Sequence, residues 1–549
     1  MIKTHWFQNL TEGMDQSSNP SMTAGSPHLQ NISQDRPGVW ATRKGSEIVG
    51  ASIGTNPGYG LFTYLANDGT RKLGAVTDRD LFFYDESGET WGSAVDTDEW
   101  TASKRVDGIN FLNRLYLGCE DGTTPLAYTT GGAITDVTPT IGGSIFAVNK
   151  NSLLVCGNNI KPNIGFYSDP YTDTFHSATG TCEANADVAG ANTVTATTSI
   201  FLPDMIGAVL YNTTDGEMNI ITGWTNDTVV TTDTDTSGWN DDTVYVLQNN
   251  FKADNAITGA ISYQEQFLVW DENQMYRFDP LSNWSSDIEN AGCVNYRTVG
   301  IVEGIALWVN REGVKLWGGE GRPQDITPKI KDRVGDLGLW DLVNPSNWDS
   351  MCAGVDTLDG KYSLSVGTLQ TVTGATASAI ADVVFVFDIK KNAWTFRNYQ
   401  DRILAITSFV DTNGDKGLYA IHNDDSFVTK LNSGATDDNA SGVGQDISVD
   451  FRTPHHQLGD PTTDNSIRNY FIRYTANAEV DVSVSINRGS YASIGTLASS
   501  SSILAKEIKP LANQFGYSFS LKFTCTGDLK IEGYGFTVEE GKTLRNSSK

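Results

Sequence analysis

Residues 266–280 read Gln266-Phe-Leu-Val-Trp-Asp-Glu-Asn-Gln-Met-Tyr-Arg-Phe-Asp-Pro280, and their pattern indicates the fold class of the chain. Two short apolar runs flank a polar turn, and the second run ends on an aromatic residue and an aspartate. Short runs rich in aromatic and branched residues, bounded by turn formers, are typical of β-strands in a hairpin. The same pattern returns along most of the chain, so it predicts a repeated β-sheet unit.

An apolar strand of this kind recurs with a regular spacing. The first residues of successive strands are 34, 38, 114, 38, 57 and 56 residues apart. The gap of 114 holds an insertion of about 75 residues, which leaves about 39, and a period near 40 with three or four strands per unit is typical of a β-propeller blade. We interpret these as the second strands of their blades: Leu81–Tyr84, Leu115–Leu117, Leu153–Val155, Phe267–Trp270, Ile305–Trp308, Tyr362–Val366 and Leu418–Ile421.

A second repeat supports this interpretation. An aromatic residue stands one or two positions before an aspartate, and another aromatic residue follows. We expect the aspartate to close a hairpin turn by accepting backbone N–H bonds. The order differs from the Ser-x-Asp-x-Gly-x-Thr-Trp box of sialidases, so we interpret it as structural. The instances are Tyr84-Asp85…Trp91, Tyr167-Ser168-Asp169…Phe175, Phe278-Asp279…Trp284 and Phe387-Asp388…Trp394.

These patterns predict an all-β protein: a β-propeller with an inserted small β-barrel or sandwich and a C-terminal β-sandwich. We expect residues 1–40 to form an N-terminal arm and 41–175 the first part of the propeller. Residues 176–250 are expected to form the inserted β-barrel domain, 251–444 the second part of the propeller, and 445–549 the C-terminal β-sandwich and tail. One helix is predicted, with Thr327 as N-cap and with Ile330 and Val334 on one face.

Composition excludes several classes of function. The chain has 39 Lys+Arg against 66 Asp+Glu, a net charge of −27, which disfavours nucleic-acid binding through a basic face and attachment to anionic membranes. Six dispersed cysteines form neither a disulfide framework nor a zinc motif, so we expect mostly buried free thiols in a protein assembled in a reducing compartment. Neither a signal peptide nor an apolar run long enough for a membrane span is visible.

Two constellations are candidates for chemistry. Asp411, Asn413 and Asp415 have the spacing of calcium ligands, but the glycine and the twelfth residue do not fit, so a hairpin turn is the better interpretation. The pair His455-His456 is expected to have a surface or interface role. Catalytic motifs such as Gly-x-Ser-x-Gly, the P-loop and His-Glu-x-x-His do not occur. We therefore name no catalytic, cofactor-binding or metal-binding residue and expect a protein that is not an enzyme.

Several blade phrases resemble a known family. They are similar to the propeller proteins at the distal tail of short-tailed bacteriophages, which include the tail nozzle (tail tubular protein B) and the related hub and packaged-DNA-stabilisation proteins. The phrases include Arg36-Pro-Gly-Val-Trp-Ala-Thr-Arg-Lys-Gly45, Asn113-Arg-Leu-Tyr-Leu-Gly118, Gly292-Cys-Val-Asn-Tyr-Arg-Thr-Val299 and Trp308-Val-Asn-Arg-Glu-Gly-Val-Lys-Leu-Trp317.

The resemblance implies a structural virion protein. Six copies would form a tail tube with an acidic lumen that retains the packaged genome and lets DNA pass during ejection, without sequence-specific binding. The implied partners are the tail adaptor or head–tail connector, tail fibres or spikes, and the host outer surface. The implied location is the virion tail, after assembly in the host cytoplasm. The N-terminal arm and residues 369–381 are candidate ties or gates.

The alternative is a virion-associated β-propeller that degrades or binds glycans, as a depolymerase or a receptor-binding protein. An enzyme of this kind requires carboxylates that converge in a pocket, whereas a conduit requires only diffuse acidic residues.

Overall fold

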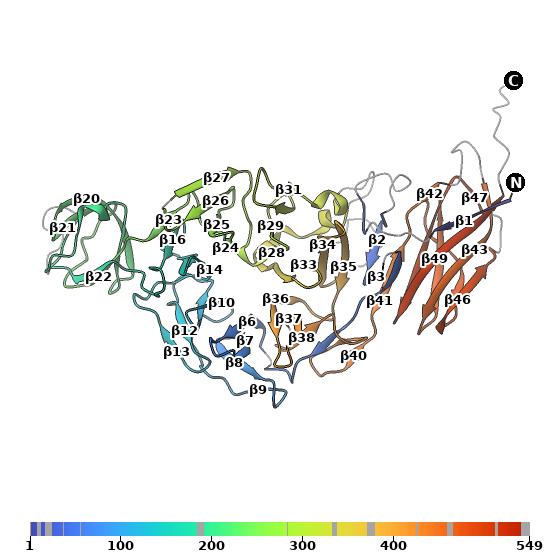
Figure 1. Cartoon of the computed structure of the whole chain (residues 1–549), viewed down its shortest axis with the longest axis horizontal. Helices are drawn as coiled ribbons and strands as arrows, with labels where there is room; N and C mark the ends of the chain where they lie inside the picture. Colours follow the sequence, from blue (N-terminus) through green and yellow to red (C-terminus); the bar gives the residue numbers. More distant parts are fainter. Residues whose placement is uncertain are drawn as a thin grey trace, which may run out of the picture.

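The computed structural model describes residues 2–539 except 8–12, 17–24, 37, 55, 184–191, 283, 332–337, 371–378, 424–425, 458–464 and 511–513. The molecule is elongated, with a small barrel at one end, a propeller in the middle and a sandwich at the other end (Figure 1). Strands dominate, and the described residues contain short 3-10 turns but no α-helix. The predicted all-β class is confirmed. The structure contains no helix, among its described residues, that is long and apolar enough to cross a bilayer.

Seven blades form the propeller in the described part of the chain, and blade 6 belongs to a ten-stranded sheet that continues into the sandwich. Blade 1 consists of β6 (Gly58–Leu65), β7 (Arg71–Thr77), β8 (Asp80–Asp85) and β9 (Thr90–Trp91). Blade 2 consists of β10 (Val106–Phe111), β11 (Arg114–Cys119), β12 (Ala127–Thr129) and β13 (Ile134–Asp136). Blade 3 consists of β14 (Ile145–Asn149), β15 (Ser152–Cys156), β16 (Ile164–Tyr167) and β23 (Asn250–Lys252).

Blade 4 consists of β24 (Gly259–Tyr263), β25 (Gln266–Trp270), β26 (Gln274–Asp279) and β27 (Trp284–Glu289). Blade 5 consists of β28 (Gly300–Val302), β29 (Ile305–Val309), β30 (Val314–Trp317) and β31 (Gln324–Asp325). Blade 6 consists of β32 (Cys352–Asp356), β33 (Lys361–Gly367), β34 (Val383–Asp388) and β35 (Ala393–Asn398). Blade 7 contains β36 (Ile403–Val410), β37 (Lys416–His422) and β38 (Val428–Leu431), with β5 (Ser46–Ile48) as its fourth strand and the short β39 (Asp437–Asp438) and β40 (Gly444–Gln445) beyond it.

Blade 7 closes the ring with a strand from the start of the chain. β5 pairs antiparallel with β38, so residues about 380 positions apart in sequence share a sheet. The buried Arg43 holds this junction: its Nη1 donates to Asp437 (2.8 Å), its Nη2 to the carbonyl of Asn398 (2.8 Å) and its Nε to Asn31 (3.0 Å). Closure of the propeller therefore depends on a side chain that contacts both of its last two blades.

The repeats identified in the sequence match the blades, with one correction. Six of the seven predicted second strands are second strands, but Leu81–Tyr84 lies in β8, the third strand of blade 1, because β7 precedes it. In the aspartate repeat, Asp85, Asp279 and Asp388 accept backbone N–H bonds of 3.0–3.1 Å, as predicted. Asp169 differs: its carboxylate accepts from the Asn249 side chain instead.

The insertion forms a closed barrel at one end of the molecule (Figure 1). Its six strands pair in the order β17-β22-β19-β20-β21-β18. The first and last strands also meet, because Thr197 N donates to Thr181 O (2.8 Å) and Glu183 N to Thr195 O (2.9 Å). The strands are β17 (Ala178–Thr181), β18 (Thr193–Thr195), β19 (Val209–Asn212), β20 (Glu217–Asn226), β21 (Val229–Thr232) and β22 (Thr243–Leu247).

The sandwich uses both ends of the chain. Its first sheet has the order β3-β4-β49-β43-β46, with β1 on β49 and β47 on β43; its second contains β2, β41, β48, β44 and β45, with β42 on β48. The first sheet consists of β1 (Ile2–Phe7), β3 (Ile32–Arg36), β4 (Val39–Thr42), β43 (Asn465–Ala476), β46 (Ser500–Ile508), β47 (Gln514–Gly516) and β49 (Leu529–Glu539). The second consists of β2 (His28–Gln30), β41 (Ser448–Arg452), β42 (His456–Gln457), β44 (Val480–Ile486), β45 (Ala492–Leu497) and β48 (Ser518–Thr526).

Two predictions need correction. The described residues of the expected N-terminal arm form strands of the sandwich, and β2 also joins it to blade 6 by pairing Gln30 with Phe396. The predicted helix is a single 3-10 turn, Thr327–Ile330, with Ile326 in the N-cap position; Val334 lies outside the described residues. The N-terminal segment is polar and rich in turn formers, so its sequence does not indicate strands. Its strands form because β1, β2 and β4 pair with strands near the far end of the sequence.

Candidate functional site

Side chains from four blades meet on the propeller axis, where the inner strands begin. Arg105 precedes β10 of blade 2, and Arg297 lies in the 3-10 turn Tyr296–Thr298 before β28 of blade 5. Ser350 ends the turn Pro345–Ser350 before β32 of blade 6, and Arg402 precedes β36 of blade 7. We call the following set the axial cluster: Arg105, Asp107, Glu120, Tyr296, Arg297, Ser350 and Arg402.

The axial cluster contains bonds between blades that are not neighbours. Tyr296 donates its hydroxyl proton to Asp107, and Arg297 forms ion pairs with Asp107 and with Glu120 (3.2 Å). Arg105 Nη2 donates to the carbonyl of Ser350 (2.7 Å). Because blades 2 and 5, and blades 2 and 6, lie across the ring from each other, these bonds bridge the axis.

The charges of the axial cluster stabilise its ion pairs across the propeller axis. Burial would lower the pKa of Arg297, but the charges of Asp107 and Glu120 outweigh it and raise the pKa above its usual range. Burial and the charge of Arg297 lower the pKa of Arg105, whose Nη1 is buried without a hydrogen-bond partner among the described residues.

Negative charge is concentrated in the barrel. Residues 176–250 contain ten Asp and Glu and no Lys or Arg, and the stretch without a basic residue extends from Lys161 to Lys252. Eight of these carboxylates are exposed among the described residues: Glu183, Asp204, Asp215, Glu217, Asp227, Asp233, Asp235 and Asp241. Residues 445–549 instead carry eleven acidic and eleven basic residues. This distribution is visible in the sequence, but the net charge of the whole chain conceals it.

One pocket lies on the seam between blades 7 and 1. It has a volume of about 560 Å³, and Glu47, Glu86, Glu89 and Asp411 line it together with Lys430. The predicted Asp411 turn is confirmed: its carboxylate accepts from Asn413 N (3.0 Å) and Asp415 N (2.8 Å) in the β36–β37 hairpin. No group of three His, Cys, Asp or Glu side chains in the described residues is arranged to hold a metal ion.

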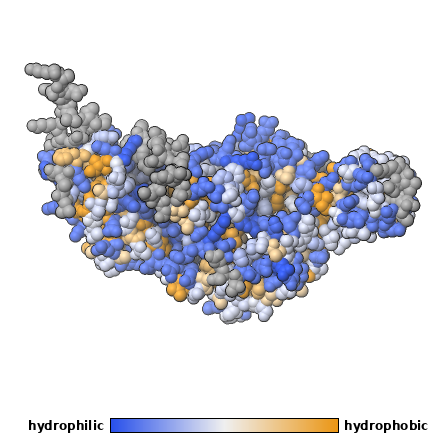
Figure 2. Space-filling view, turned by 180° about the vertical axis from the view of Figure 1, so that it is seen from behind, coloured by the Kyte–Doolittle hydropathy of each residue, from blue (hydrophilic) through white to orange (hydrophobic). Residues whose placement is uncertain are grey.

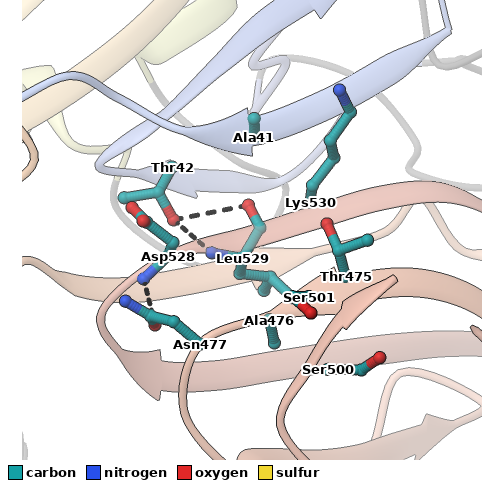
Figure 3. A pocket seen from close by; sticks show the side chains of 10 residues that line it. All are labelled: Ala41, Thr42, Thr475, Ala476, Asn477, Ser500, Ser501, Asp528, Leu529 and Lys530. Carbon is teal, nitrogen blue, oxygen red and sulfur yellow. Dashed lines mark hydrogen bonds between the residues drawn. The ribbon is translucent and has the colours of Figure 1, made fainter. Parts of the chain in front are cut away.

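A second pocket, of about 410 Å³, lies between β4, β43, β46 and β49 (Figure 3). Its polar groups stabilise the fold: Leu529 N donates to Thr42 Oγ1 (2.8 Å) and Asp528 N to Asn477 Oδ1 (2.6 Å). Asp528 is the one carboxylate among its lining residues. It therefore lacks the pair of carboxyl groups that glycoside hydrolysis requires.

The histidine pair singled out in the sequence lies within the sandwich, with His455 buried and His456 half-buried, and its predicted surface or interface role stays a prediction. The side chain of His455 is buried, and His456 stacks on Phe7 at 3.7 Å and bonds the hydroxyl of Tyr534 (2.6 Å). Burial, with smaller effects from His455 and His5, lowers the pKa of His456 to about 3. His456 is therefore neutral at physiological pH and packs as an aromatic ring.

The cysteines are free thiols, as predicted. Five are buried and Cys525 is half-buried. Burial raises the pKa of Cys119 to about 11 and those of Cys182 and Cys293 to about 12. These thiols stay protonated and are poor nucleophiles. Of the candidate gate 369–381, residues 371–378 lie outside the described part.

No family profile matches the chain, and no curated protein sequence is similar to it. Solved structures are similar in fold. One from a crystal structure of the mitotic checkpoint complex is 9% identical, with a TM-score of 0.38, covering 70% of this chain and 91% of that one. BBS1N, in a crystal structure with ARL6DN, is 12% identical with a TM-score of 0.28, and the match covers 71% of this chain and 96% of that one. Dihydro-heme d1 dehydrogenase NirN is 9% identical with a TM-score of 0.30, and the match covers 68% of this chain and 60% of that one. The similarity is to β-propeller proteins and concerns the fold alone.

Proposed function

We propose that this protein is a structural virion protein that forms the hexameric tail nozzle or hub of a short-tailed bacteriophage. The phrases quoted above support this proposal, together with the order of propeller, inserted barrel and sandwich. In this role the protein acts as a passive conduit that holds back the packaged genome and lets DNA pass during ejection. Its partners are the tail adaptor, fibres or spikes, and at infection the host outer surface.

The charge distribution is the observation that carries the proposal. A barrel with ten acidic and no basic residues repels phosphate groups, so DNA slides past it without binding. Six copies carry a total charge of about −160. Because the axial cluster bridges the propeller, the DNA channel in this proposal lies between copies, on the axis of the ring.

Electron microscopy of the intact virion tests the proposal. The expected result is six copies around the tail axis below the portal, with the acidic barrels facing the channel. A single copy away from the axis, or a channel lined with Lys and Arg, contradicts it. A nitrocellulose filter assay with duplex DNA at low salt gives a second test, in which the purified protein is expected to retain no DNA.

A glycan hydrolase is the second candidate, and one observation favours it. Burial raises the pKa of Glu99 to about 7, with further contributions from its hydrogen bond to Asp96 and the charges of Asp96 and Asp136. A carboxyl group with a raised pKa beside a carboxylate is the usual arrangement of a general acid. Loss of host-polysaccharide cleavage in Glu99→Gln would support this candidate, whereas absence of cleavage by the wild-type protein removes it.

A further inference from the structure

The first sheet of the sandwich has two open edges in the described part of the chain. β46 ends the strand order on one side. On the other side, β1 pairs with β49 alone, next to the β3-β4 hairpin. Unpaired N–H and C=O groups along a strand edge are a template for pairing with another strand, so proteins usually cover or shorten such edges.

β46 is a long and exposed edge. It spans nine residues, contains no proline, and is exposed at every position from 501 to 507. Ile503 and Leu504 are 48% and 43% exposed. Figure 2 shows hydrophobic surface at this end of the molecule, on a face that is otherwise largely hydrophilic. An exposed edge strand with apolar side chains marks an interaction site.

β1 has complementary properties. Trp6 is 41% exposed, and Lys3 and Thr4 beside it are also exposed. The chain directions also fit: β1 is antiparallel to β49, β49 to β43 and β43 to β46. If a second copy continues the sheet in the same sense, its β1 meets the β46 edge antiparallel, which is the pairing used throughout this sheet.

We propose that β46 of one copy pairs with β1 of the next, so that the sheet continues from subunit to subunit. The contact joins two different surfaces, as a closed ring requires. Residues 445–549 carry equal numbers of acidic and basic residues, so these regions of two copies approach without the repulsion that acts between the acidic barrels. This inference rests on the proposed function, because it supplies the contact between subunits of the ring.

Thiol cross-linking tests the pairing. Trp6, Gly535, Phe471 and Glu507 form one row across the sheet, so a copy that continues the sheet in register places its Trp6 opposite Glu507. Thr4, two residues from Trp6, is then a diagonal neighbour of Glu507 on the same face. The double variant Thr4→Cys/Glu507→Cys, in a full-length Cys525→Ser background, is treated with a short bismaleimide at high protein concentration. Denaturing gels are expected to show a ladder of covalent oligomers that ends at a closed ring.

The single variants are the controls. Neither Thr4→Cys nor Glu507→Cys alone is expected to form dimers. Dimers of Glu507→Cys alone would mean that β46 pairs with itself, and the absence of a ladder in the double variant would mean that the edges do not meet; either result overturns the inference. A ring on the tail axis without a ladder leaves the proposed function standing. A ladder without a ring in the virion removes the proposed function instead.

A second test does not depend on cysteines. Ile503→Asp/Leu504→Asp places charge on the exposed edge, and Leu281→Asp/Leu358→Asp changes two exposed leucines of the propeller, which are 63% and 65% exposed. Light scattering is expected to show that the edge variant raises the concentration for association by about tenfold or more, whereas the control leaves it unchanged. Equal effects of the two variants would contradict the pairing.

Discussion

The inserted barrel and the terminal sandwich are both small β-domains on one propeller, but the chain builds them differently. The barrel uses one continuous segment, closes its own strand edges and has its own core around Phe201, Trp239 and Val246. The sandwich takes strands from both ends of the chain, and its core continues into blades 5 and 6 through residues such as Trp394 and Phe451. The barrel is thus an appendage, whereas the sandwich is part of the closure of the propeller.

Removal of residues 1–50 is expected to have the largest effect, because the sandwich and blade 7 both take strands from this segment whereas the barrel takes none. The deletion removes β1 to β4 from the sandwich and β5 from blade 7. We expect no cooperatively folded protein, since the last blade loses a strand and the shared core is opened. Circular dichroism and calorimetry measure the outcome; a truncated protein with a cooperative melting transition would show that the sandwich is as independent as the barrel.

Arg43→Ala is expected to cost about 3–5 kcal/mol in the free energy of unfolding, because it leaves the buried Asp437 carboxylate without its partner. Urea unfolding measures the change. The control is Arg79→Ala, which removes an exposed ion pair with Asp98 at 2.5 Å and is expected to cost less than about 1 kcal/mol. Similar costs for the two variants would show that Arg43 does not hold the closure.

Replacement of residues 178–247 by a short Gly-Ser linker is expected to leave the propeller and the sandwich folded. Ser177 N already bonds the carbonyl of Val246, so the ends of the segment lie close together. The expected cost is about 2 kcal/mol, because Phe175 and its neighbours in blades 2 and 3 lose contacts with Tyr211 and Leu247. Calorimetry checks this value, and loss of the main transition would contradict the independence of the barrel.

Glu99→Gln is expected to have the smallest effect. The folded protein raises the pKa of Glu99 from 4.5 to about 7, so it binds the proton more tightly than the unfolded chain does. The stabilisation is complete below the unfolded pKa and is lost as the pH rises through about 7. The variant should therefore match the wild type at pH 4 and exceed its stability at pH 8 by less than about 1 kcal/mol, because water screens this exposed side chain. Melting temperatures at the two pH values test the sign.

The accuracy of the sequence-based predictions follows the same contrast. Blade strands such as Phe267–Trp270 and the turns at Asp279 and Asp388 are local, because a hairpin needs only neighbouring residues to form. The barrel was also predictable, since its strands and turns follow one another in a single segment. The charge gap between Lys161 and Lys252 was visible in the sequence too, but net charge alone concealed it.

The axial cluster and the open edges of the sandwich were not predictable. Arg297 and Asp107 lie 190 residues apart, and a spacing of that length carries no local signal. β1, β2 and β4 pair with strands near the other end of the chain, and their own segment reads as polar and irregular. His456 is half-buried for the same reason, because Phe7 and Tyr534 contact it from opposite ends of the sequence.

The all-β class, the blade repeat, the inserted segment and the acidic character of the surface can be read from the amino-acid sequence alone. These properties follow from alternation of side chains and from composition, which act over a few residues. How the ring closes, which side chains bridge its axis and which strand edges stay open are seen in the three-dimensional structure and not in the sequence. Those depend on contacts between distant segments, whose pairing is set by packing and burial and not by any short pattern.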